Sequence, residues 1–186
     1  MKKLSLLALL VATCTVAMAQ PRAIGGRIGY SYGISYQHQI GEKSMIQADL
    51  DLLAYRFQGI QGTATFNWII PLKACEVVNW NLITGVGAGV GFQRYGGGDI
   101  IWFPLDYGGR GIFVGVAGMI GMEWNFKFPL QLAIEYRPLI GPIFSQKRDY
   151  YEDYSVKKEG IGVDFYYRGL FSGALAIGIR YKFSGK

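Results

Sequence analysis

Apolar side chains recur at every second residue over most of the chain, and this period of two constrains the fold more than any other feature of the sequence. Residues 79–92 show it most clearly, because large apolar side chains there alternate with asparagine or glycine. Such alternation is typical of a β-strand with two different faces, whereas a helix repeats its apolar positions every three or four residues. The same pattern recurs at residues 45–57, 62–70, 112–126, 129–139 and 171–183. The sequence therefore predicts an all-β fold.

Composition indicates which solvent each face of these strands meets. Glycine accounts for 27 of the 186 residues, about twice its usual share, and only 17% of the residues are charged. A soluble sandwich exposes polar side chains, whereas a membrane barrel turns apolar side chains to lipid and keeps polar ones in its lumen. Here the face opposite the apolar one carries a few charges together with runs of glycine, which would make a poor solvated surface. The pattern predicts a membrane-spanning, antiparallel, up-and-down β-barrel.

Residues 1–19 have the three parts of a secretory signal peptide. Two lysines near the start are followed by an apolar segment over residues 4–16 and by a small-x-small motif that ends at Ala19. The apolar segment is too short to cross a bilayer as a helix, which needs about 20 residues. We expect cleavage between Ala19 and Gln20, which leaves residues 20–186 as an exported barrel domain.

The strand count follows from the rule that single-chain outer-membrane barrels have an even number of strands. Residues 23–40 read as one long strand, which would bring the total to seven. We therefore divide this segment at residues 31–33, a three-residue hairpin loop with glycine at its last position, which pairs Tyr30 with Ile34. The division predicts eight strands, with both termini and the short turns on the periplasmic side. Two long loops, residues 93–111 and 141–169, are expected outside the cell.

The end of the chain resembles the C-terminal signal of outer-membrane barrels, with Gly178 followed by the aromatic residues Tyr181 and Phe183. Residues 23–183 resemble the small eight-stranded outer-membrane proteins of the Bacteroidota type, which are related in architecture to the OmpA and OmpX barrels. The segments that carry this resemblance are ISYQH at 34–38, GVGAG at 85–89 and PLQLAIEYRP at 129–138. The resemblance implies insertion by the barrel-assembly machinery into the outer membrane of a Gram-negative cell, but it implies no activity.

Charged residues on the face expected to line the lumen are balanced, with four of each sign. They are Arg27, Asp49, Asp51, Glu123, Glu135, Arg137, Arg180 and Lys182. Asp49 and Asp51, two residues apart on one strand face, could form a paired-carboxylate site. We favour the other interpretation, a neutralised salt-bridge network in a lumen too narrow for a channel, because an eight-stranded barrel is just filled by side chains.

The lumen-facing glycines also have two interpretations. They could form a pocket for an acyl chain, as in lipid A acyltransferase barrels, or, as we favour, leave room for large side chains reaching across from other strands. These glycines are Gly85, Gly87, Gly89 and Gly91, and the side chains expected to reach across are Arg27, Tyr55, Arg137 and Arg180.

Catalytic and metal-binding residues are scarce. The only histidine, His38, is expected on the lipid face, away from the serine and acid that a hydrolase would need. Cys75 is the one cysteine outside the signal peptide, so histidine and cysteine cannot supply a metal cluster. We expect no enzymatic activity and no metal or other cofactor.

The two external loops are the candidate contact surfaces. Residues 141–169 mix tyrosine with both charges; we favour a solvated hairpin that extends the barrel walls and meets lipopolysaccharide phosphates over a specific extracellular protein or glycan site. Residues 93–111 are more hydrophobic and are expected to fold over the barrel mouth or dip into the outer leaflet. The contact candidates are Trp102, Phe103, Lys147, Arg148, Tyr150, Tyr151 and Tyr154.

Function is predicted only by class. The chain carries a net charge of +6, but no basic run interleaved with stacking aromatics indicates nucleic-acid binding. We favour a non-enzymatic structural or interaction protein of the outer membrane, with membrane lipids and lipopolysaccharide as its partners. The alternatives are a lipid A modifying enzyme and a narrow pore for small solutes.

Overall fold

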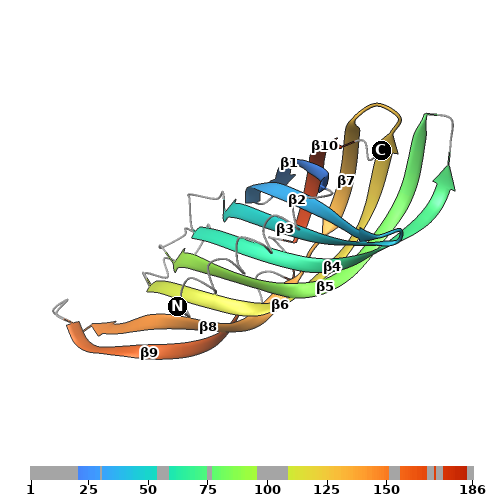
Figure 1. Ribbon diagram of the computed structural model, residues 1–186. Helices are drawn as coiled ribbons and strands as arrows, with labels where there is room; N and C mark the ends of the chain where they lie inside the picture. Colours follow the sequence, from blue (N-terminus) through green and yellow to red (C-terminus); the bar gives the residue numbers. More distant parts are fainter. Residues whose placement is uncertain are drawn as a thin grey trace, which may run out of the picture.

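The computed structural model describes residues 21–29, 31–53, 59–74, 77–95, 109–150, 156–166, 170 and 174–183. The described residues form ten strands (Figure 1). These are β1 (Pro21–Gly29), β2 (Ser31–Gly41), β3 (Ser44–Leu53), β4 (Gly59–Ala74), β5 (Val78–Tyr95), β6 (Gly109–Phe126), β7 (Leu130–Tyr136), β8 (Leu139–Tyr150), β9 (Val156–Tyr166) and β10 (Leu175–Lys182). No helix within these ranges is long and apolar enough to cross a membrane.

Eight of the strands close into an antiparallel ring. Strands β1 to β7 pair in sequence order, β7 pairs with β10, and β10 pairs back with β1. The prediction of an all-β, eight-stranded antiparallel barrel is therefore confirmed. The β4–β5 and β6–β7 turns lie at the same end of the ring as the C-terminus, and we call this the terminal end (Figure 1).

The segment expected to be an external loop, residues 141–169, is instead largely strand. β8 and β9 pair antiparallel, from Gly141 with Tyr166 to Tyr150 with Val156. The prediction of a loop is therefore wrong. The favoured interpretation of this segment, a hairpin that extends the barrel wall, agrees with the pairing. The period of two persists here, because Ile161, Val163 and Phe165 all point outward and are exposed. Charged residues in the same segment obscured that period in the sequence.

β7 and β8 share one neighbour, β6, on either side of a break at Pro138. β7 pairs with the part of β6 nearer the terminal end and β8 with the part farther from it. At the break the amide of Gly118 donates to the carbonyl of Pro138 and the amide of Arg137 donates to the carbonyl of Ala174. Proline cannot donate a ladder hydrogen bond, so these two bonds keep the wall connected where the strand is interrupted.

The first hairpin turns earlier than expected. Ile28 pairs with Tyr32 and Gly26 with Ile34, so residues 31–33 belong to β2, and the predicted pairing of Tyr30 with Ile34 is wrong. Gly33 lies opposite Asp51 in the ladder, and a Cβ there would collide with the Asp51 carboxylate. The glycine thus serves the close approach of a side chain rather than a turn.

The two faces of the barrel differ sharply in polarity. Outward positions carry large apolar side chains, and Ile34 is 64% exposed. Many inward positions carry polar or charged side chains, and Gln47, Asn67 and Gln131 are completely buried. Such burial of polar groups with exposure of apolar ones is the reverse of a soluble domain.

Candidate functional site: the charged lumen

Six charged side chains meet inside the barrel, and we call them the lumen cluster. Strands β1, β3, β7 and β10 carry five of them at inward-facing positions, and Arg137 directly follows the last residue of β7. The members are Arg27, Asp49, Asp51, Glu135, Arg137 and Arg180, and all are buried. Their burial follows from strand parity, since side chains two residues apart share one face of a strand.

Glu135 is the centre of the lumen cluster, because three arginines converge on its carboxylate. Arg27 Nε donates to Glu135 Oε2 at 3.1 Å, and Arg137 Nη2 donates to the same oxygen at 2.9 Å. Arg180 Nη2 donates to the other oxygen, Oε1. A buried carboxylate is stable only when it is paired and hydrogen-bonded, and these contacts meet that condition.

The two aspartates of β3 share Arg27, which also lies within ion-pair distance of Asp49 at 3.8 Å, and Asp49 is paired with Arg137 as well. Arg27 Nη1 donates to Asp51 Oδ2 at 2.7 Å, and Arg137 Nη1 donates to Asp49 Oδ2. Arg137 Nη1 also donates to Thr63 Oγ1 of β4 at 3.0 Å. A general base needs a carboxylate that is free to take a proton from a substrate, whereas both of these carboxylates are engaged by buried guanidinium groups. The arrangement is suited to holding strands together.

A second charged group lies nearer the terminal end. Arg22 Nη1 donates to Glu123 Oε2 at 2.9 Å, and Arg22 Nη2 donates to Oε1. Asn81 and Asn125 donate to the same carboxylate. Lys182 lies at this mouth of the barrel and donates to the carbonyl of Phe126. The eight expected lumen residues are therefore divided between two levels.

Arg22 is a lumen residue that the sequence pattern missed. Strict alternation places residue 22 on the outward face, together with Ile24 and Ile28. A register shift between Pro21 and Ala23 inserts one extra residue into β1, and the resulting β-bulge lets Arg22 reach Glu123. Bulges re-aim side chains in this way at barrel rims, and no local sequence signal announces this one.

An apolar cluster formed by Phe113, Ala117, Leu139 and Ile143 fills the lumen farther from the terminal end. The ring of Phe113 covers Gly91, where a Cβ would collide with it. At Gly87 a Cβ would instead meet backbone atoms of β4, and at Gly85 it would meet both the β4 backbone and the side-chain amide of Asn67. The expectation that these glycines leave room for arginines is therefore wrong. They allow close approach of the neighbouring strand and of Phe113, and Tyr55 lies outside the described residues.

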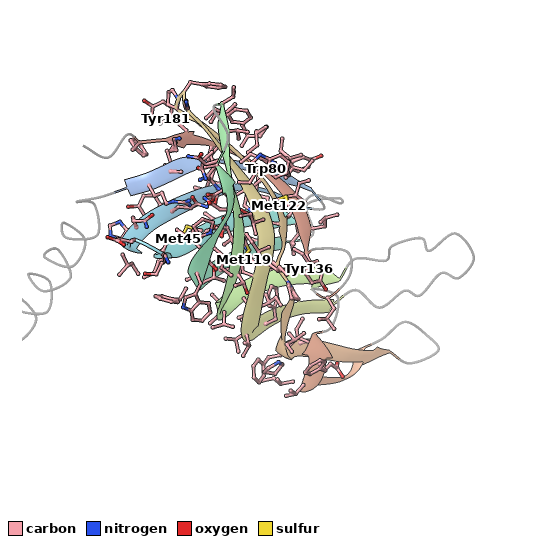
Figure 2. The ribbon with its side chains drawn as sticks, turned by 90° about the vertical axis from the view of Figure 1, so that its right-hand side faces the viewer. Met45, Trp80, Met119, Met122, Tyr136 and Tyr181 are labelled. Carbon is pink, nitrogen blue, oxygen red and sulfur yellow. The ribbon has the colours of Figure 1, made fainter. Side chains whose placement is uncertain are left out.

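A second apolar cluster lies on the inner face of β3 to β6. It consists of Met45, Ile69, Ile83 and Met119. Figure 2 labels the two methionines. Arg22 Nη1 lies 3.0 Å from the sulfur of Met45, so this cluster adjoins the charged group at the terminal end. The described lumen is thus occupied by charged, polar and apolar side chains in turn.

Aromatic side chains gather on the outer face near the terminal end. Trp80 and Trp124 contact edge to face with ring centroids 5.5 Å apart, and Tyr181 and Phe183 do so at 5.3 Å. Figure 2 shows Trp80 and Tyr181 nearer the β6–β7 turn than Tyr136. His38 stacks on Tyr36 at the same end and accepts or donates a 3.3 Å hydrogen bond with it. Gly178 faces inward beside the Arg180 guanidinium.

The remaining predicted site residues are only partly described. Lys147, Arg148 and Tyr150 belong to strand β8 rather than to a loop. The other contact candidates and the expected cleavage site lie outside the described residues: Trp102, Phe103, Tyr151, Tyr154, Ala19 and Gln20. Within the described ranges, no group of three or more metal-ligating side chains is placed to hold an ion.

The ring of strands and the charged lumen define the class of this protein, an eight-stranded antiparallel β-barrel with polar side chains inside and apolar side chains outside. No family model, curated protein or solved structure matches the chain. The ring of eight antiparallel strands is compatible with a small outer-membrane barrel.

Proposed function

We propose that the protein is an integral outer-membrane β-barrel with a side-chain-filled lumen, which acts without catalysis through the segments that project from the membrane. The observation that carries this proposal is the reversed polarity of the wall, apolar outside and charged inside. A bilayer is the solvent in which such an outer face is stable, and a closed barrel satisfies its backbone hydrogen bonds there.

The contents of the lumen favour a closed barrel over a pore. The lumen cluster ties β1, β3, β7 and β10 together with buried ion pairs. The apolar cluster of Phe113 and its neighbours occupies the next level. An eight-stranded barrel has space for such side chains and for little else. A solute would have to break several buried ion pairs to pass.

The length of β5 and β6 and the β8–β9 hairpin support a role at the cell surface. β5 and β6 contain 18 residues each, whereas about 9–11 residues suffice to cross a bilayer as a strand. These strands and the β8–β9 hairpin therefore extend past the hydrocarbon region on the side away from the terminal end. There the protein would meet lipopolysaccharide and extracellular partners.

Cell fractionation combined with gel electrophoresis tests the location. We expect the protein in the outer-membrane fraction, exported by its signal peptide and inserted by the barrel-assembly machinery, with a faster-migrating form in unheated samples because a folded barrel resists the detergent. Recovery as a soluble periplasmic protein contradicts the proposal.

Planar-bilayer recordings and lipid analysis test the mode of action. A filled lumen predicts no sustained single-channel conductance and no swelling of liposomes in small solutes. Mass spectrometry of lipid A from cells with and without the protein is expected to give identical species. Steady conductance favours the pore, and a new lipid A species favours the enzyme.

A further inference from the structure

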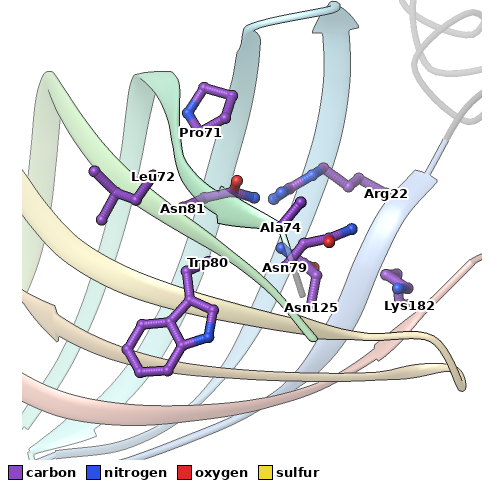
Figure 3. Close-up of a pocket in the computed structure, with 9 residues that line it drawn as sticks. All are labelled: Arg22, Pro71, Leu72, Ala74, Asn79, Trp80, Asn81, Asn125 and Lys182. Carbon is purple, nitrogen blue, oxygen red and sulfur yellow. The ribbon is translucent and has the colours of Figure 1, made fainter. Parts of the chain in front are cut away.

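A concavity of about 520 Å³ opens at the terminal end of the barrel (Figure 3). Its lumen side is lined by two cations, Arg22 and Lys182, and by the amides of Asn79, Asn81 and Asn125. None of its described lining residues is a carboxylate. The concavity thus offers hydrogen-bond donors and positive charge to whatever enters it.

Arg22 is paired with Glu123, whereas Lys182 has no described ion pair. Among the described lumen residues, Lys182 is a fifth cation beside Arg22, Arg27, Arg137 and Arg180, against four carboxylates. Glu123, the nearest acid, already accepts both Arg22 Nη groups and two asparagine amides. Lys182 makes its one described hydrogen bond to a backbone carbonyl. A bound anion would balance the positive charge of Lys182.

The opposite lip of the concavity is apolar. Leu72 and Trp80 line it, and Figure 3 shows them on the side away from Arg22 and Lys182. Leu72 is the extra residue of a β-bulge between Pro71 and Lys73. Two bulges, at Arg22 and at Leu72, therefore shape the same concavity. Bulges concentrate at barrel rims and beside binding sites, where they redirect side chains.

We propose that this concavity binds the phosphate of a phospholipid from the inner leaflet, with Lys182 facing the phosphate beside the Glu123-paired Arg22, and with Leu72 and Trp80 contacting the start of the acyl chains. A cationic floor beside an apolar lip matches a molecule whose charge and hydrocarbon are adjacent, and Trp suits that boundary. The inference rests on the proposed membrane location.

The test uses the full barrel purified in a non-ionic detergent and titrated by native mass spectrometry. Phosphatidylglycerol is the probe, diacylglycerol with the same chains lacks the phosphate, and glycerol phosphate lacks the chains. We expect both partial ligands to bind at least about tenfold more weakly than phosphatidylglycerol, because each loses one half of the contact.

Variants assign the contact to named residues. Lys182→Gln is expected to weaken phosphatidylglycerol binding at least about fivefold, and Lys182→Arg is expected to preserve it within about twofold. Leu72→Ser should weaken the binding of phosphatidylglycerol but leave the binding of glycerol phosphate unchanged. The matched control is Lys127→Gln, which removes an exposed lysine from the β6–β7 turn at the same end and should have no effect.

The outcomes are separable. Equal binding of diacylglycerol, equal binding of glycerol phosphate, or equal losses in Lys182→Gln and Lys127→Gln each overturn the lipid site. Flotation of the same preparations with liposomes and their heat-dependent gel mobility report the proposed function independently. Insertion without phospholipid preference overturns only this inference, whereas failure to insert overturns the proposed function as well.

Discussion

Two parts of the barrel wall fill one lumen by opposite means. The charged wall of β1, β3, β7 and β10 carries the six residues of the lumen cluster, which reach across to one another. The glycine wall, centred on Gly85, Gly87, Gly89 and Gly91 of β5, carries almost no side chain and lets backbone and Phe113 come close. The charged wall depends on pairing, and the glycine wall depends on the absence of a Cβ.

The difference shows that the large side chains of one wall do not fill the space left by the glycines of the other. Arginines do not occupy the space above the glycines; they bind carboxylates, and Arg137 reaches β4 only at Thr63. The β4 backbone lies close to Gly85 and Gly87, where a Cβ would collide with it. The stability of the two walls should therefore respond to different substitutions.

The largest effect is expected at the centre of the charged wall. Glu135→Gln leaves three buried arginines without their shared anion, and we expect it to lower the free energy of unfolding by about 3–5 kcal/mol. Urea unfolding in detergent micelles, followed by gel mobility, measures the loss. Glu42→Gln, which removes a carboxylate from an exposed turn, is the control, and equal losses in the two variants contradict the account.

Removal of the ring that covers the glycine wall should come next. Phe113→Ala opens a cavity above Gly91, and we expect a loss of about 3 kcal/mol from the missing packing. Tryptophan fluorescence during guanidinium unfolding reports it. Phe113→Leu, which keeps most of the volume, should lose less than half as much. If Phe113→Ala loses almost no stability, the Phe113 side chain does not fill the lumen above Gly91.

A single methyl group should disturb the glycine wall itself. In Gly87→Ala the new Cβ collides with the carbonyl of Ala64, and we expect a loss of about 1–3 kcal/mol as the strands move apart. In Gly62→Ala the nearest heavy atom is 3.9 Å from the new Cβ, so that change should lie within about 0.5 kcal/mol of zero. Thermal unfolding by circular dichroism distinguishes the two. If alanine is tolerated equally at positions 87 and 62, the β4 backbone does not lie as close to Gly87 as described.

The smallest effect is expected where the walls meet. Thr63→Val removes the hydroxyl that Arg137 Nη1 contacts while keeping the shape of the side chain, and we expect a loss of about 1 kcal/mol. Thr84→Val, on the outer face of β5, should be neutral or slightly stabilising in a membrane. The refolding yield across a urea series compares the two variants. No loss of stability in Thr63→Val would mean that the contact of Arg137 with Thr63 does not link β4 to the charged wall.

The period of two was sufficient to predict most of this architecture. Together with the even-number rule for barrels it predicted the eight strands of the ring, and by itself it predicted their inward and outward faces and the inward position of residues such as Glu135, because strand parity is a local property of the sequence. It failed where the ladder is irregular. The bulge at Arg22 and the early turn before Ser31 depend on pairing with other strands, which alternation does not encode.

The roles of particular residues were less predictable than their faces. Glu135 contacts three arginines, whereas Asp49 contacts two and Asp51 one, and this distribution depends on the relative stagger of four strands. The glycines were correctly placed on the inner face, but their nearest neighbours are the β4 strand, Leu139 and Phe113 rather than an arginine. Charged residues within β8 and β9 hid two strands that the outer apolar side chains support.

The central claim, that the apolar outer face meets lipid, is tested most directly by spin labels on that face. A nitroxide at position 177, midway along β10, is compared with one at position 42 in an exposed turn, in the protein reconstituted into vesicles. The account predicts that oxygen dissolved in the bilayer relaxes the label at 177 more than a water-soluble nickel chelate does, with the opposite order at 42. Equal access of the nickel chelate to both positions would contradict it.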